Sequence, residues 1–90
     1  MAVGLYFSAV MSPTQYDDVI RKLDQAGAGA PKGRTYHVAF LEGDKLSVFD
    51  VWDSQADFEA FGATLMPILT ESGIQPPEPA ISEIHNVISG

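Results

Sequence analysis

Hydrophobic and polar positions alternate along the chain in a pattern that predicts four strands and two helices. The four segments rich in β-branched and aromatic side chains, which are typical of strands, are residues 2–10, 34–42, 45–52 and 80–88. Two sets of hydrophobic residues recur instead at helical spacing: Tyr16, Val19, Ile20 and Leu23, and then Phe58, Phe61, Leu65 and Leu69. The predicted order is therefore strand, helix, strand, strand, helix, strand.

The first helix has recognisable residues at both ends. Ser12 is suited to the N-cap, Pro13 is tolerated at the first helical position, and Gln15 can complete a capping box. Gly27 is then expected just beyond the last helical residue, where a left-handed backbone is common.

The second helix is expected to start after Asp53 or Ser54, with Asp57 placed to complete the box that Ser54 begins. Pro67 lies inside its hydrophobic pattern. A proline there removes a backbone hydrogen bond, so the helix should kink or break in the preceding turn. Gly73 is expected to end it.

The central hairpin determines which residues face each other. A two-residue turn at positions 43–44, with the sequence Gly-Asp, would pair Glu42 with Lys45. Counting back along both strands places His37 directly opposite Asp50, with Cβ atoms about 4.5–5.5 Å apart.

The element order predicts one α+β domain over residues 1–90. Two right-handed crossovers with this order give a ferredoxin-like βαββαβ sandwich with an antiparallel sheet of strand order 4-1-3-2. Both helices would cover the same face of the sheet and leave the other face open.

The open face is unusually hydrophobic for a surface in contact with water. Hydrophobic residues make up 46% of the chain, and several strands are apolar on both sides. A sheet that is apolar on both faces is normally buried on both. We therefore expect a homodimer that covers this face. The residues expected at that contact are Tyr36, Val38, Phe40, Phe49 and Val51.

The opposite face carries the candidate site. His37, Asp50 and Trp52 would point toward the helices, and Ala39 beside them would leave room for a cavity. A carboxylate next to a histidine selects the tautomer of the imidazole, which suits a general base or acid. A cross-strand pair of this kind also occurs as a structural ion pair, and the sequence leaves both interpretations open.

Two further residues are candidate ligand contacts. Tyr6 lies on a central strand and could donate its hydroxyl, although Tyr16 and Tyr36 could do the same. His85 lies on the last strand, where it could contact either a ligand or a second subunit. We expect His37 and Asp50 to be catalytic, and Trp52, Tyr6 and His85 to bind substrate.

Charge and composition exclude several classes of function. The formal net charge of −7 disfavours nucleic acid as a partner. The absence of cysteine removes disulfides and thiolate metal sites, and two histidines far apart in sequence give no metal cluster. We expect no cofactor and no metal. No hydrophobic run is long enough to span a bilayer, and no signal peptide is recognisable, so a cytoplasmic location without membrane contact is expected.

The segment Asp50-Val51-Trp52-Asp53-Ser54, followed by Phe58 and Phe61, resembles a motif of the dimeric α+β barrel superfamily. Within this superfamily, the segment resembles the antibiotic biosynthesis monooxygenase-like group. The resemblance implies two chains packed sheet to sheet, each with a pocket between its helices and its sheet. Some members oxidise polyphenolic rings without metal or flavin, whereas others handle haem.

The resemblance places the tryptophan of the family at Trp52, which would line the pocket, and its acidic residue at Asp50. The histidine that many members carry in the second helix has no counterpart within residues 55–66, which disfavours a haem-handling or regulatory role. We therefore expect a small-molecule pocket protein, such as a cofactor-free monooxygenase or isomerase acting on aromatic or polyketide-like compounds. The alternative is a non-catalytic ligand-binding or structural dimer, so the sequence leaves enzymatic activity open.

Overall fold

The strands and helices form close to where the hydrophobic pattern predicts them. The computed structural model describes residues 1–90. In chain order, its elements are β1 (Val3–Met11), α1 (Pro13–Gln25), β2 (Arg34–Glu42), β3 (Lys45–Trp52), α2 (Gln55–Glu71) and β4 (Ala80–Glu83). The four strands form one antiparallel sheet in the order β2-β3-β1-β4, so the predicted ferredoxin-like topology is confirmed.

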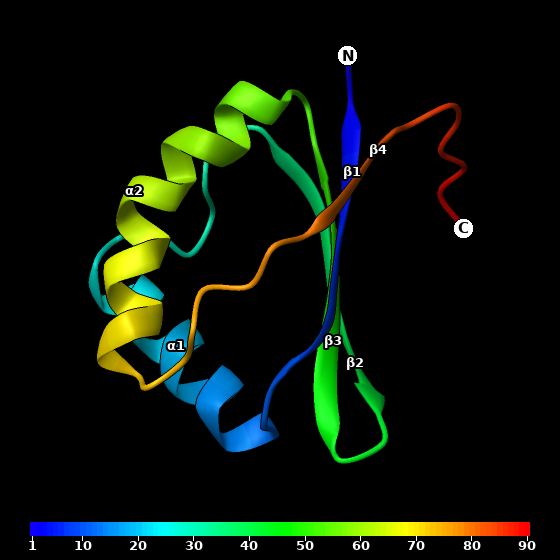
Figure 1. Ribbon diagram of the computed structural model, residues 1–90. Coiled ribbons are helices and arrows are strands. Elements are labelled where there is room, and N and C mark those ends of the chain that lie inside the picture. Colours follow the sequence, from blue (N-terminus) through cyan, green and yellow to red (C-terminus); the bar gives the residue numbers. More distant parts are fainter.

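The molecule has two layers (Figure 1). Both helices pack on one face of the sheet, and the segment after β4 passes over the opposite face. The core between helices and sheet consists of two hydrophobic clusters. One lies mainly between the helices and contains Met11, Val19, Leu23, Ile68, Leu69 and Ile74. The other lies between the sheet and α2 and contains Leu5, Phe7, Val48, Trp52 and Phe58. Neither helix has the length and hydrophobicity that crossing a lipid bilayer would require.

The ends of the helices agree with the polar residues that predict them. Ser12 and Gln15 form a complete capping box at α1, and Gly27 has the left-handed φ of 73° expected after the helix. At α2, Ser54 rather than Asp53 is the N-cap, and its side chain accepts a hydrogen bond from the backbone N–H of Asp57. The return bond of the box does not form there.

Helix α2 does not break at Pro67, where a kink or a break is expected. It runs without interruption from Gln55 to Glu71, with the proline inside. The two residues that follow the proline, Ile68 and Leu69, are both buried in the cluster between the helices. This burial keeps the last turn in place although the proline removes one backbone hydrogen bond.

The last strand is shorter than predicted. Strand β4 ends at Glu83, and the backbone N–H of Ile84 makes one more bond to the carbonyl of Ala2. Because β1 begins at Val3, the chain has no partner backbone beyond this point. The expectation of a strand to residue 88 is therefore wrong, and His85 lies outside the sheet.

Strand β1 contains a bulge that its sequence does not indicate. The pairing with β3 shifts between Phe7 and Met11, and Ala9 has a φ of 48°, which is rare for a residue other than glycine. The backbone N–H of Ala9 donates to Ser47 Oγ at 2.9 Å. As a result, Val10 packs against both hydrophobic clusters instead of lying on the open face with Tyr6.

Candidate functional site

The register of the β2-β3 hairpin brings His37 and Asp50 together as predicted. The two residues are directly paired, and His37 Nδ1 lies 2.5 Å from Asp50 Oδ1. The other carboxylate oxygen, Oδ2, accepts a hydrogen bond from Trp52 Nε1 at 3.3 Å. Asp50 is only 5% exposed, so these two donors take the place of water around its carboxylate.

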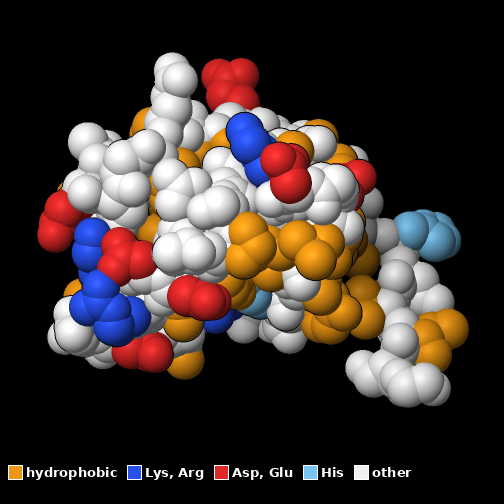
Figure 2. Space-filling view, turned by 90° about the horizontal axis from the view of Figure 1, so that it is seen from below, with side chains coloured by type: hydrophobic (Ala, Val, Ile, Leu, Met, Phe, Trp, Pro, Cys, Tyr) orange, Lys and Arg blue, Asp and Glu red, His pale blue; other side chains and the backbone are white.

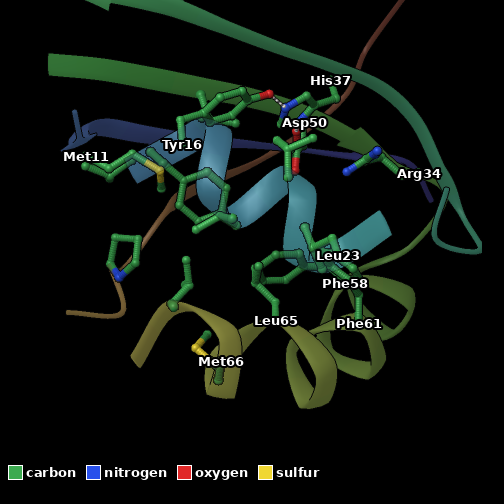
Figure 3. A pocket seen from close by; sticks show the side chains of 17 residues that line it. Met11, Tyr16, Leu23, Arg34, His37, Asp50, Phe58, Phe61, Leu65 and Met66 are labelled. Carbon is green, nitrogen blue, oxygen red and sulfur yellow. Dashed lines mark hydrogen bonds and ion pairs between the residues drawn. The ribbon is translucent and has the colours of Figure 1, made fainter. Parts of the chain in front are cut away.

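Tyr16, on the first turns of α1, extends this pair into a chain of three side chains (Figure 3). Its hydroxyl lies 2.7 Å from His37 Nε2, and the two rings are nearly parallel with centroids 6.0 Å apart. An ionised Asp50 can only accept, so His37 carries its proton on Nδ1. Nε2 then accepts from the Tyr16 hydroxyl. The direction of donation is therefore from Tyr16 to His37 to Asp50.

The surroundings of Tyr16 favour its neutral form. Partial burial is the largest influence and raises the pKa of the phenol above its usual value of 10.0. The positive charge of Arg34 acts in the opposite direction, whereas the negative charges of Asp50 and Asp17 add to the increase. At neutral pH the phenol thus keeps its proton and donates a hydrogen bond to the imidazole.

A cavity lies between the helices and the sheet, at the boundary of the two hydrophobic clusters. Thirteen of its 17 lining residues are hydrophobic, and it opens to solvent. Its polar wall is formed by Tyr16, His37, Asp50 and Arg34, which Figure 3 shows gathered on the sheet side of the cavity. The volume is about 70 Å³. That is enough for several water molecules, but it is smaller than the ~150 Å³ cavity known to accept benzene.

Side chains of α2 form the wall opposite the polar groups. Leu65 and Met66 lie there, and Met66 is 36% exposed. A methionine side chain is unbranched and changes rotamer easily, so this wall can move outward to admit a larger ligand. The cavity therefore has one rigid polar side on the sheet and one adaptable hydrophobic side on the helix.

Three of the predicted site residues lie elsewhere. Trp52 has no exposed surface and does not line the cavity; it packs edge-on against Phe58 with ring centroids 5.6 Å apart. Tyr6 lies on the open face, where its hydroxyl donates to Glu42 and its ring stacks on Phe40. His85 is exposed on the segment after β4.

These positions change the expected set of cavity residues. Tyr6 and His85 cannot reach the same ligand as His37, because one is on the other side of the sheet and the other is outside it. Tyr16 takes the place proposed for Tyr6. The sequence favours Tyr6 because it lies on a central strand, and it does not single out Tyr16, because the position of α1 over β2 is a tertiary property. No three His, Cys, Asp or Glu side chains lie close enough together to hold a metal ion.

Solved structures with the same arrangement of elements identify the fold. A protein from Chloroflexus aurantiacus J-10-fl, named as a candidate antibiotic biosynthesis monooxygenase, superimposes with a TM-score of 0.70. The match covers 99% of this chain and 98% of that one at 20% identity. The chain has the fold of the antibiotic biosynthesis monooxygenases.

Other structures with this fold differ in what is known of them. SnoaB, a cofactor-independent oxygenase from Streptomyces nogalater, matches with a TM-score of 0.61 and 18% identity over 99% of this chain and 95% of its own. NE2512 from Nitrosomonas europaea, a protein of unknown function, matches with a TM-score of 0.56 and 22% identity over 99% and 94%. No family model and no curated protein matches the sequence.

Proposed function

We propose that this protein binds flat aromatic or polyketide-like compounds in the cavity and acts on them as a cofactor-free oxygenase or isomerase. The observation that carries the proposal is the hydrogen-bonded chain from Asp50 through His37 to Tyr16, which ends at a largely hydrophobic cavity. A base in such surroundings can remove a proton from a weakly acidic carbon. The likeness in fold to a cofactor-independent oxygenase supports the same class of chemistry.

The three side chains have different roles in this proposal. Tyr16 meets the substrate, because its hydroxyl occupies the one free nitrogen of His37. As the phenol accepts a proton from the acidic carbon, its own proton moves to His37 Nε2. Asp50 holds the imidazole by Nδ1 and stabilises the imidazolium that forms. The carbon is left as an enolate.

Two reactions can follow from this enolate. In an isomerisation, the proton on His37 returns to another carbon through Tyr16, and nothing else is consumed. In an oxygenation, the enolate transfers electrons to dioxygen and forms a carbon–oxygen bond. The resulting peroxide anion takes up the proton stored on His37 and becomes a hydroperoxide. The hydroperoxide then loses the second proton from carbon together with hydroxide, and these two combine as water. A CH₂ group and O₂ thereby give a C=O group and one water.

Proton exchange with 2-tetralone, a bicyclic ketone with an acidic CH₂ group, tests the first step. In D₂O without oxygen, the wild-type protein should speed deuterium incorporation at that carbon, as followed by NMR. His37→Ala should lower the rate by about 100-fold, as expected for loss of a general base. His85→Ala is the matched control, because that histidine is exposed and outside the cavity. Equal rates in His37→Ala and wild type would refute the proposal.

Admitting oxygen separates the two reactions. An oxygenase should consume one O₂ for each 2-tetralone oxidised at the acidic carbon, measured with an oxygen electrode. An isomerase should show exchange without oxygen uptake.

A non-catalytic role is the second candidate, and the small cavity volume of about 70 Å³ favours it. In that case the three side chains only fasten α1 to the sheet. Compounds of the 2-tetralone size would then raise the melting temperature of the protein, or fail to bind, without any exchange. A ligand-dependent shift that disappears in His37→Ala would indicate a binding protein.

We also propose that two copies associate through the open sheet face. Tyr36 and Phe40 are 53% and 37% exposed there, and Figure 2 shows hydrophobic side chains gathered on the sheet side of the molecule. The segment after β4 covers only part of this face, over Phe49 and Val51. A patch of this kind is typical of an interface.

Sedimentation at micromolar concentration tests the association. Phe40→Lys should convert a dimer into a monomer. Leu41→Lys is the matched control, because Leu41 is 64% exposed but points to the other side of β2. A wild-type protein that sediments as a monomer would contradict this proposal.

A further inference from the structure

Arg34 is the one cavity residue whose hydrogen-bonding capacity is largely unused. It is the first residue of β2, and its guanidinium group points into the cavity at the end where His37 and Asp50 lie (Figure 3). One terminal nitrogen donates to the carbonyl of Gly29 at 3.1 Å. Arg34 forms no ion pair and no other side-chain hydrogen bond within the protein. Most of its five N–H donors therefore lack a protein acceptor.

Asp50 does not act as the partner of this charge. Its two oxygens are taken by His37 and Trp52, and no carboxylate lies within ion-pair distance of Arg34. The guanidinium is nevertheless close enough for its charge to oppose the increase in the pKa of Tyr16. The cavity thus holds a positive charge beside the groups assigned to proton transfer, although the whole chain carries a net charge of −7.

The local backbone keeps Arg34 in this place. Gly33 has a φ of 90°, and a Cβ atom there would lie 2.6 Å from the Cβ atom of Asp57 on α2. Only glycine allows the loop before β2 to approach α2 so closely. The carbonyl of Gly33 also accepts from the backbone N–H of Asp53 at 2.7 Å. The loop is therefore anchored on both sides of the point where the arginine enters the cavity.

From this geometry we infer that the ligand carries an anionic oxygen, as a carboxylate or an enolate, which Arg34 binds while the flat body of the ligand lies among the hydrophobic side chains. A guanidinium presents two parallel N–H donors, which match the two oxygens of a carboxylate. The inference rests on the proposed function for the placement of the reacting carbon. It adds Arg34 as a residue that determines specificity, for a substrate that either carries a carboxylate or becomes an enolate during the reaction.

Benzoate and benzamide form a suitable pair of probes, because they have the same shape and differ in charge. Titrations followed by protein NMR at low salt should show that the wild-type protein binds benzoate at least about tenfold more tightly than benzamide, as expected for a hydrogen bond to a charged group. Arg34→Gln should bind both equally. Lys32→Gln removes the same charge from the exposed loop nearby and should keep the preference.

An unchanged rate of 2-tetralone exchange in Arg34→Gln would overturn the inference for an enolate. Three results would overturn it for a carboxylate. These are equal binding of both probes to the wild type, an unchanged preference in Arg34→Gln, and equal losses in Arg34→Gln and Lys32→Gln. Binding of an enolate that forms during the reaction is distinguished from binding of a carboxylate by the proton exchange of 2-tetralone. If Arg34→Gln slows its proton exchange without changing benzoate binding, Arg34 binds the enolate and not a carboxylate.

The failure of this inference and the failure of the proposed function are separable. Binding of benzoate that depends on Arg34, without proton exchange that depends on His37, would support the anion site and refute the enzyme. Exchange of 2-tetralone that depends on His37 but not on Arg34, with no preference for benzoate, would support the enzyme and refute the anion site.

Discussion

An Asp50→Asn variant keeps the size of the buried side chain and removes its charge. In the wild type, Asp50 accepts hydrogen bonds from two buried donors, His37 Nδ1 at 2.5 Å and Trp52 Nε1 at 3.3 Å. An asparagine amide has only one oxygen, so its NH₂ group must face one of these donors. His37 can avoid the conflict by moving its proton to Nε2 and donating to the Tyr16 oxygen, but the hydroxyl proton of Tyr16 then loses its acceptor in the protein.

Either arrangement leaves one interaction of the chain unsatisfied. A buried donor without an acceptor costs about 1–3 kcal/mol, and a bond to a charged acceptor is stronger than one to an amide. Because Asp50 is only 5% exposed, water cannot fully replace the missing acceptor. We expect the free energy of unfolding to fall by about 2 kcal/mol. In a domain of this size, that corresponds to a melting temperature lower by roughly 8–16 °C.

Urea unfolding followed by tryptophan fluorescence measures this change. Trp52 is the only tryptophan and has no exposed surface, so its emission reports the loss of the core. Asp53→Asn is the matched control, because Asp53 is exposed and a surface substitution usually changes stability by no more than about 0.5 kcal/mol. If Asp50→Asn is as stable as Asp53→Asn, the carboxylate does not hold the three side chains together, and Asp50 does not organise the site.

Further predictions concern the phenol, two glycines and the helical proline. The difference between the ultraviolet pH titrations of the wild type and Tyr16→Phe should show a phenol that ionises above pH 10.0, and ionisation at or below pH 10.0 would contradict this. The stability that Tyr16 contributes is therefore present below pH 10.0 and is lost as the pH rises through the increased pKa. Gly33→Ala should lower the free energy of unfolding by about 2 kcal/mol or more, because of its positive φ and the clash with Asp57. Gly62→Ala, in open space on α2, should raise the free energy of unfolding by about 0.5–1 kcal/mol. Equal effects of the two substitutions on urea unfolding would contradict this prediction. Pro67→Ala should stabilise the protein by about 1–3 kcal/mol, because α2 continues through this exposed position; a loss of stability would show that the proline is needed.

The hairpin shows how much of the site could be predicted from sequence. A Gly-Asp turn at 43–44 allows only a few registers, and the alternation of side chains then assigns every residue of both strands to a face. The pairing of His37 with Asp50 follows from this local rule, and the structure confirms it. The same rule assigns Trp52 to the correct face, but it does not show that α2 covers the ring completely.

The parts that sequence reasoning missed depend on contacts between distant elements. The length of β4 is set by where β1 begins, because a strand at the edge continues only as far as its neighbour provides backbone partners. Hydrophobic residues such as Val87 and Ile88 continue the pattern beyond that point but remain 62% and 82% exposed. Tyr16 could be assigned to the buried side of its helix, yet its contact with His37 requires the position of α1 over β2.

A hydrogen-bonded network on the open face lies beside the bulge of β1. Glu42 accepts hydrogen bonds from the hydroxyls of Tyr6 and Ser47, and these bonds, that from Ser47 most of all, lower the pKa of its carboxyl. Ser47 in turn accepts from the backbone N–H of Ala9, where β1 bulges before α1 begins. The bulge sets the point at which the chain turns into the helix that carries Tyr16. Tyr6, expected to donate directly to a ligand, instead belongs to this hydrogen-bonded network on the opposite face of the sheet.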